Sequence, residues 1–215
     1  ANYIQTFTEL AEGYEKNTGA TIQPTFSSTG SLYNQIRNGA PYDLFLSADE
    51  KRPRLLYEEG LSDEPFVYAQ GRAILWSADH NFCKSDDWKE ALASRSGRIA
   101  LANPVTAPYG TVALDAIRKV GLESTLKDRF VTAQTVAQAF QYASAGSVEA
   151  GFCALSAVVS EEGKKGCYYH ISEAQPVVQA ACILVRSGNR EAVENFAAYL
   201  VSDEALKIRE GYGYE

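Results

Sequence analysis

The hydrophobic and polar positions of the chain follow two alternating periods. Short runs of apolar and β-branched residues, typical of strands, are followed by longer stretches in which apolar residues recur every three or four positions, as on one face of a helix. The runs that predict strands are 21–26, 43–46, 72–77, 97–102, 130–132, 148–153, 167–171 and 177–185. The stretches that predict helices are 30–38, 49–59, 86–94, 109–120, 136–143, 154–161, 190–201 and 203–210.

This alternation predicts an α/β fold with mostly parallel sheets. A strand, a turn rich in hydroxyl or Pro and Gly residues, and a helix follow one another in the first third of the chain and again in its middle. The pattern favours two Rossmann-like lobes around a ligand cleft, joined by hinge strands. We expect a discontinuous first lobe of residues 1–72 and 186–215, and a second lobe of residues 73–185 that includes the hinge strands.

Two of the predicted helix starts have the chemistry of an anion site. They are Phe26-Ser27-Ser28-Thr29-Gly30-Ser31-Leu32 and Ala107-Pro108-Tyr109-Gly110-Thr111. Each places hydroxyl groups and free backbone N–H groups at a helix N-terminus, where the helix dipole favours negative charge. Neither contains Lys or Arg, and neither contains a His, Asp or Glu that could accept a proton from a ligand. A single such turn is typical of an ordinary capped helix, but its recurrence indicates a site for a small, fully deprotonated oxyanion.

Composition narrows the class of protein. The 215 residues are 46% hydrophobic and 22% charged, as in an ordinary globular protein large enough to bury a core. No apolar run reaches the length of a membrane helix and the N-terminus does not resemble a signal peptide, so we expect a cytosolic or already processed chain. The net charge of −7 is spread without a basic stripe, which argues against binding to nucleic acid or to anionic membranes.

The cysteines and histidines do not form a site in the sequence. Cys83, Cys153, Cys167 and Cys182 lie far apart without metal-ligand spacing, so zinc is not expected. The even count allows one or two disulfides, of a pairing that the sequence does not give, or buried free thiols. No nucleophile, base and orienting residue surround His80 or His170, which we interpret as structurally incidental.

Several segments resemble a known family. The first is residues 26–32, followed by Asn38-Gly39-Ala40-Pro41-Tyr42-Asp43-Leu44-Phe45-Leu46-Ser47-Ala48-Asp49. It is similar to the first-lobe signature of periplasmic molybdate-binding proteins, the receptors of molybdate ABC importers. The resemblance continues through Ala102-Asn103-Pro104, residues 107–110 and 151–156, and Gly211-Tyr212-Gly213-Tyr214, and thus covers nearly the whole chain in order.

The resemblance implies a type II periplasmic binding protein fold and a receptor of high affinity for molybdate or tungstate. Carried over residue by residue, it implies an oxyanion site made by Asn2, Ser28, Thr29, the Ala48 amide, Tyr109 and the Val136 amide. It implies no catalytic residue and no cofactor, and molybdenum bound as molybdate without direct ligation by the protein. Hydrogen phosphate would bring a proton without an acceptor, at a cost of about 1–3 kcal/mol.

The resemblance also implies where the protein works and with what. We expect a monomeric, periplasmic mature chain without its signal peptide, which delivers the anion to a membrane ABC permease and neither enters the membrane nor binds nucleic acid. Two departures from the family pattern concern the site. Ala154 stands in a segment where many members have a Tyr, so Tyr109 is expected to supply the phenol, and the family's first strand would begin before Ala1.

Other functions remain open at this stage. A receptor for sulfate or another tetrahedral oxyanion has the same requirements, although a rigid cavity built for molybdate would leave the smaller sulfate out of reach of some donors. An enzyme on the same bilobal fold could use Cys153 as nucleophile or cofactor anchor, but no base or cation is predicted beside it. A regulatory effector domain is a further alternative, although no helix-turn-helix segment accompanies it. The sequence does not rank molybdate over tungstate.

Overall fold

The chain forms two compact units in the computed structural model, which describes all of residues 1–215. The first unit consists of Ala1, Tyr3–Gly71 and Val178–Glu215, and the second of Asn2 and Arg72–Val177. The chain therefore passes from one unit to the other after Gly71 and returns after Val177. Residues 178–185, which the sequence grouped with the second lobe, lie in the first unit because they pair there with a strand of that unit.

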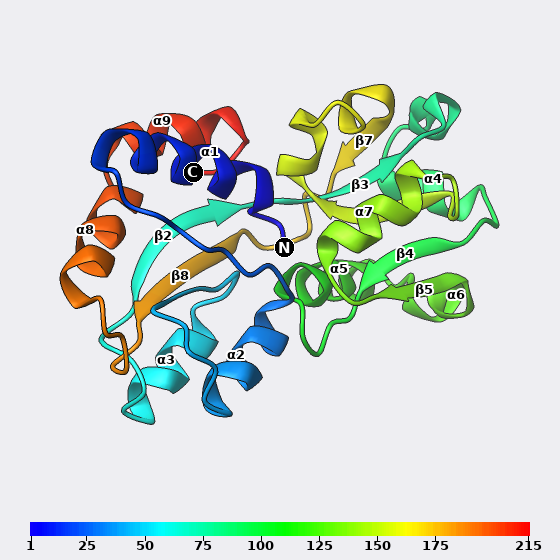
Figure 1. Ribbon diagram of the computed structural model, residues 1–215. Helices are drawn as coiled ribbons and strands as arrows, with labels where there is room; N and C mark the ends of the chain where they lie inside the picture. Colours follow the sequence, from blue (N-terminus) through cyan, green and yellow to red (C-terminus); the bar gives the residue numbers. More distant parts are fainter. The chain divides into compact units, whose positions relative to one another are not determined.

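The first unit is built on a three-stranded sheet with helices on both faces. Its strands β1 (Leu44–Leu46), β8 (Val177–Ile183) and β2 (Phe66–Gly71) stand in the order β1-β8-β2, and β1 runs antiparallel to β8. The helices are α1 (Ile4–Thr18), α2 (Thr29–Arg37), α3 (Lys51–Glu58), α8 (Arg190–Leu200) and α9 (Asp203–Gly211). Figure 1 shows α1 and α9 on one side of β2 and β8, and α2 and α3 on the other.

Neighbouring residues of β8 pack into different core clusters of this unit. Ala181 packs into a cluster with aromatic and apolar side chains of α1, β2, α8 and α9, while Cys182 packs with residues of α2, β1 and α3. Successive side chains of a strand point to opposite faces of a sheet, so one buried strand can hold both layers together. This explains why the sequence of β8 reads as a nearly continuous apolar run.

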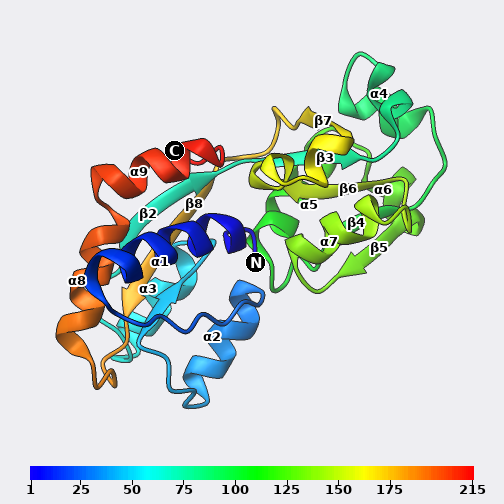
Figure 2. The same cartoon turned by 45° about the horizontal axis from the view of Figure 1, so that its top comes forward.

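The second unit has a five-stranded mixed sheet. Its strands are β3 (Ala73–Ser77), β4 (Ile99–Ala102), β5 (Phe130–Ala133), β6 (Ala150–Ala154) and β7 (Cys167–His170), in the order β5-β4-β6-β3-β7. Strand β4 is parallel to β5 and β6, whereas β3 is antiparallel to β6 and β7. The helices, also seen in Figure 2, are α4 (Trp88–Ala93), α5 (Pro108–Lys119), α6 (Glu123–Leu126) and α7 (Val136–Ser144). The 3-10 helices are η1 (His80–Lys84), η2 (Lys127–Arg129), η3 (Leu155–Val159) and η4 (Gly163–Lys165).

The second unit carries one disulfide. Cys83 in η1 is bonded to Cys167 in β7 across 84 residues of sequence, whereas Cys153 and Cys182 are buried free thiols. A bridge over a loop of this length removes much of the conformational freedom of the unfolded chain. The even cysteine count thus corresponds to one disulfide, one of the alternatives that the sequence left open.

The α/β class is confirmed, and the sheets are mixed rather than mostly parallel. The predicted strand at 21–26 is wrong: Pro24 has no N–H to donate, and the N–H of Ile22 donates to the Glu15 carboxylate instead of a strand. Helix α1 and strand β2 were not among the predicted elements. The predicted helix at 154–161 is a shorter 3-10 helix, since Ala154 is the last residue of β6.

Candidate functional site

The six residues of the predicted oxyanion site are divided between the two units. Ser28, Thr29 and Ala48 lie in the first unit. Asn2, Tyr109 and Val136 lie in the second. Each set is described within its own unit, starting from the segment of chain that positions it.

Ser28 and Thr29 form the start of α2. Ser28 is the N-cap residue, and its Oγ accepts a hydrogen bond from the N–H of Ser31 at 3.3 Å. The Oγ of Ser31 lies 2.8 Å from the Oγ of Ser28, and when Ser31 is the donor in this contact the Ser28 hydrogen is left for a ligand. Both Ser28 and Thr29 are buried. The first N–H groups of the helix have no acceptor within the helix, so this end offers donors only.

Ala48 is joined to Thr29 by a buried hydrogen bond. The N–H of Ala48 donates to Oγ1 of Thr29 at 3.1 Å, between residues 19 positions apart in sequence. A hydroxyl oxygen that accepts a bond from one side directs its single hydrogen elsewhere. Thr29 is thereby arranged as a hydrogen-bond donor. The N–H of Ala48 is used in this bond to Thr29, so it is not available to donate to a ligand in this structure.

Ala48 itself lies in a closed turn after β1. The Oγ of Ser47 donates to Oδ1 of Asp49 at 3.0 Å, and the N–H of Asp49 donates back to Oγ of Ser47 at 3.1 Å. The same carboxylate accepts the N–H of Arg52 at 2.9 Å and pairs with the Arg52 guanidinium. These contacts occupy Asp49, so its negative charge is paired with a cation beside the turn.

Tyr109 is the second residue of α5, directly after Pro108. It is buried, and its N–H has no acceptor within the helix because it belongs to the first turn. The next residue, Gly110, lies so close to β4 that a Cβ at this position would be 2.0 Å from the carbonyl oxygen of Ala102. A glycine is required here because the start of the helix packs directly on the end of the strand.

Val136 is the first residue of α7, where the sequence placed a helix start. Thr135 caps this helix by accepting the N–H of Gln138 at 3.1 Å, and the Gln138 side chain accepts the N–H of Gln134 at 2.6 Å. This arrangement leaves the N–H of Val136 without an acceptor in its helix. Val136 is buried, so the amide sits in a water-poor setting.

Asn2 is attached to the second unit through its backbone. The Oγ of Ser156, in η3, donates to the carbonyl oxygen of Asn2 at 2.9 Å. The two residues are 154 positions apart, so no local pattern in the sequence could predict this contact. The Ser156 and Thr29 links are therefore features of the site that sequence reasoning missed.

The enzyme alternative would need a reactive cysteine thiol, and the two free thiols are in environments that disfavour the thiolate. Cys153 is fully buried, its Sγ donates to the carbonyl oxygen of Gly151 at 3.2 Å, and desolvation raises the pKa of its thiol far above the usual range. Burial likewise raises the pKa of Cys182 to about 11. A thiol is nucleophilic as its thiolate, so these environments oppose covalent catalysis. Over residues 1–215, no three or more His, Cys, Asp or Glu side chains gather as a metal site.

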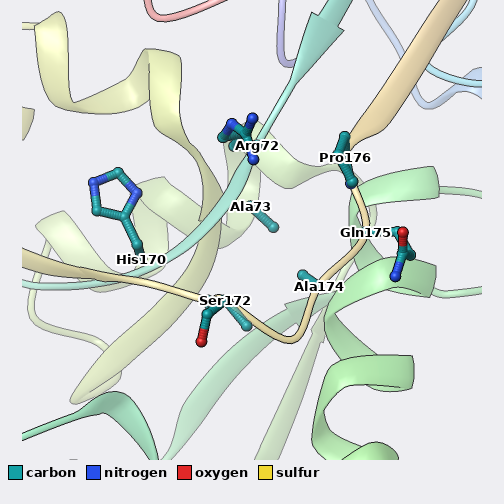
Figure 3. A pocket seen from close by; sticks show the side chains of 8 residues that line it. Arg72, Ala73, His170, Ser172, Ala174, Gln175 and Pro176 are labelled. Carbon is teal, nitrogen blue, oxygen red and sulfur yellow. The ribbon is translucent and has the colours of Figure 1, made fainter.

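A separate cavity lies in the second unit and is lined by none of the six residues. Its walls come from the start of β3 and from the segment between β7 and β8: Arg72, Ala73, His170, Ile171, Ser172, Ala174, Gln175 and Pro176. Figure 3 shows that His170 and Gln175 stand at opposite ends of this group rather than converging on one point.

Two α/β units joined by two crossings, with helix starts that present neutral donors, define the class of solute-binding proteins. The chain belongs to the family described as bacterial extracellular solute-binding protein, whose model matches residues 1–215. It is 34% identical over 216 residues to the molybdate-binding protein ModA of Rhodobacter capsulatus, covering 100% of this chain and 85% of that protein. It is 34% identical over 220 residues to ModA of Azotobacter vinelandii, covering 100% and 86%.

A solved structure agrees with these relatives. The periplasmic molybdate-binding protein of Azotobacter vinelandii superposes with a TM-score of 0.93 at 33% identity, over 100% of this chain and 95% of that one. The fold expected from the resemblance is thereby confirmed. None of the helices in the structure combines the length and the hydrophobicity needed to cross a bilayer.

Proposed function

We propose that this chain is an extracytoplasmic receptor that binds molybdate, and also tungstate, and delivers the anion to a membrane ABC permease. The observation that carries the proposal is similarity over the entire chain, at 34% identity, to proteins named for molybdate binding. The neutral donors at the starts of α2, α5 and α7 supply a physical basis for it.

The proposed binding residues are Asn2, Ser28, Thr29, Ala48, Tyr109 and Val136. The Ala48 amide contributes through its hydrogen bond to Thr29, and the other five donate to one anion. Helix N-termini carry a partial positive charge and unpaired N–H groups, and hydroxyl donors add directed hydrogen bonds. None of these residues carries a net charge, so the attraction of a dianion to a protein of net charge −7 has to come from local dipoles.

The same donors select among anions. Molybdate and tungstate are fully ionised at neutral pH and can accept every bond, whereas hydrogen phosphate carries a proton for which the site has no acceptor. The buried donor left unpaired would cost about 1–3 kcal/mol. Sulfate has no such proton, so it has to be disfavoured by its smaller size.

The disulfide supports the proposed location. A bond between Cys83 and Cys167 suits an oxidising compartment such as the periplasm, where disulfides persist. In this setting we propose a monomer that carries the anion to the permease without entering the membrane, and that catalyses no reaction.

Thermal unfolding with added anions tests the function. Ligand at a thousand times its dissociation constant stabilises the folded state by about 4 kcal/mol, which raises the melting temperature of a chain of this size by roughly 8–16 °C. We expect this with molybdate and tungstate, and no shift with phosphate at the same concentration and ionic strength. A shift with sulfate alone would favour the sulfate receptor, and no shift with any tetrahedral dianion would refute the receptor function.

A further inference from the structure

A buried polar pair lies behind the turn that holds Ala48. The hydroxyl of Tyr68, in β2, lies 3.2 Å from the carbonyl oxygen of Ser47 and 3.1 Å from Oε1 of Gln179, in β8. Tyr68 is 3% exposed, and Ser47 and Gln179 are 0% exposed. All three residues belong to the first unit.

Most of the surroundings of Tyr68 are apolar or aromatic. Its ring meets the ring of Tyr3 edge-on at a centroid distance of 5.2 Å, within a core that includes Leu10 and Ala181. Burying a hydroxyl and a carboxamide in such a core costs free energy, and only hydrogen bonding offsets that cost. A Phe at position 68 would fill the same space without the hydroxyl, so packing alone does not require a Tyr there. Desolvation raises the pKa of Tyr68 well above its usual value, which keeps the hydroxyl a donor at every physiological pH.

The carbonyl of Ser47 and the N–H of Ala48 belong to one peptide group. A peptide group is planar and rigid, so a hydrogen bond that fixes the carbonyl oxygen also fixes the direction of the N–H on the opposite side. That N–H donates to Oγ1 of Thr29 at 3.1 Å. The single hydrogen of the Tyr68 hydroxyl can lie on the Ser47 carbonyl or on Oε1 of Gln179. With the hydrogen on the Ser47 carbonyl, the Tyr68 hydroxyl, the peptide and the Thr29 hydroxyl form a continuous chain of hydrogen bonds that ends at the proposed anion site.

The chain of bonds runs in one direction. When Tyr68 donates to the carbonyl of Ser47, the peptide is polarised and its N–H becomes a stronger donor, which in turn strengthens Thr29 as a donor. The contacts between Ser47 and Asp49 hold the turn itself but do not touch this peptide oxygen.

We propose that Tyr68 is a positioning residue for oxyanion binding, which fixes the peptide between Ser47 and Ala48 and so directs the Thr29 hydroxyl toward the anion. This inference rests on the proposed function. Tyr68 does not touch the ligand in this account, and the Ala48 amide contributes through Thr29.

Calorimetric titration of Tyr68→Phe with molybdate tests the proposal. The substitution keeps the ring and its packing, and we expect about a three- to tenfold loss of affinity. Tyr3→Phe is the matched control, because Tyr3 lies in the same aromatic cluster and its buried hydroxyl interacts with Arg209 rather than with the carbonyl oxygen of Ser47. We expect Tyr3→Phe to bind as the wild type does. Unchanged affinity in Tyr68→Phe, or an equal loss in both variants, would overturn the proposal.

A double-mutant cycle separates positioning from a general effect on the core. If Tyr68 acts through Thr29, adding Tyr68→Phe to Thr29→Ala should change the affinity by less than about twofold, because the Thr29 hydroxyl that Tyr68 would position is already absent. Equal losses in the two backgrounds would contradict this route. Failure of the wild type to bind molybdate would instead refute the proposed function.

A measurement on the wild type covers the case in which Tyr68→Phe does not fold. Hydrogen exchange should find the Ala48 amide protected without ligand, because it already donates to Thr29, and molybdate should add no more protection there than it adds to other buried amides of the first unit. An Ala48 amide that exchanges readily and becomes protected only with molybdate would mean that it binds the anion directly, which would overturn the proposal.

Discussion

The oxyanion site proposed for this protein consists of small, neutral side chains whose hydrogen bonds give them direction. Thr29 accepts the N–H of Ala48, and Ser28 accepts the N–H of Ser31, so acceptor positions on both hydroxyl oxygens are used within the protein. Thr29 retains its hydrogen for a ligand, and Ser28 retains its own when Ser31 is the donor in the contact between their hydroxyl groups. A dianion with no proton of its own is the ligand best matched by this arrangement.

Substitution of Thr29 and Tyr109 tests this assignment residue by residue. Thr29→Ala removes a donor to a charged ligand and should weaken molybdate binding about ten- to a hundredfold in calorimetry. Tyr109→Phe should cost a similar factor if the phenol oxygen binds the anion, and almost nothing if only the backbone amide contributes. The controls are Thr8→Ala, on the exposed face of α1, and Tyr57→Phe, which is 43% exposed.

The two substitutions should also be coupled. Because both residues are proposed to donate to the same anion, the losses in the double mutant should differ from the sum of the single losses, as they do for residues that share a partner. Unchanged molybdate affinity in the folded double mutant would show that neither residue belongs to the binding site.

Among the elements, the position of α5 against β4 depends on a single residue, Gly110. A methyl group at Gly110 would be 2.0 Å from the carbonyl oxygen of Ala102, so Gly110→Ala has to push the start of α5 away from β4. We expect a loss of about 1–3 kcal/mol in unfolding free energy and, since Tyr109 moves with the helix, about tenfold weaker molybdate binding.

Chemical denaturation and titration of the same protein would check both effects. Gly188→Ala is the control, because a Cβ at Gly188 meets no atom within 4 Å and the backbone there is not left-handed. Full stability in Gly110→Ala would be inconsistent with the close packing of α5 on β4.

A second element, the segment between β7 and β8, is fastened to α4 by Glu173. Its carboxylate accepts bonds from Lys89 Nζ at 2.8 Å and Trp88 Nε1 at 2.9 Å. Chiefly through Lys89, the pKa of Glu173 falls from 4.5 to about 2. A lowered pKa in the folded state stabilises the protein above the unfolded value, and this contribution is lost as the pH falls from 4.5 toward 2.

Glu173→Gln should therefore destabilise the protein in a pH-dependent way. At pH 7 we expect a loss of about 1 kcal/mol, or a melting temperature lower by about 2–4 °C. The difference from the wild type should shrink as the pH falls below about 4.5. A difference that stayed constant down to pH 3, or one matched by the exposed-surface control Glu58→Gln, would rule out this ion pair as the cause.

The elements were predictable where the signal was local. The helices at α2, α5 and α7 begin within one residue of where the Ser28, Pro108 and Thr135 turns place them, because capping chemistry is contained in a few adjacent residues. The strand expected at 21–26 failed because β-prone residues form a strand only with a partner. Helix α1 was missed although its buried residues Thr6, Phe7, Leu10 and Ala11 have helical spacing.

The contacts that orient the candidate site could not be predicted in the same way. Thr29 and Ala48 are 19 positions apart, and Tyr68 and Gln179 are 111 apart. Such contacts depend on how strands are ordered in a sheet, and β8 lies between β1 and β2 although it is the last strand in sequence. The resemblance supplied the proposed binding residues, but the hydrogen bonds that direct them required the structure.

For the molecule as a whole, the central fact is that an acidic protein is proposed to bind a dianion. With a net charge of −7 and a pI near 5.0, its overall field opposes the ligand. The affinity has to come from local dipoles and directed hydrogen bonds, none of which titrates near neutral pH. Binding should therefore be nearly independent of pH between about 6 and 9, unlike binding through a histidine of pKa about 6.5.

Isothermal titration of the wild type with molybdate, repeated from pH 6 to pH 9 and with phosphate as the matched anion, tests this claim most directly. We expect one molybdate per chain, with an affinity that changes less than about threefold over this range, and no binding of phosphate. Absence of molybdate binding would contradict the receptor function. A steep loss of affinity near pH 6.5, or phosphate bound as tightly as molybdate, would contradict a site made of neutral donors.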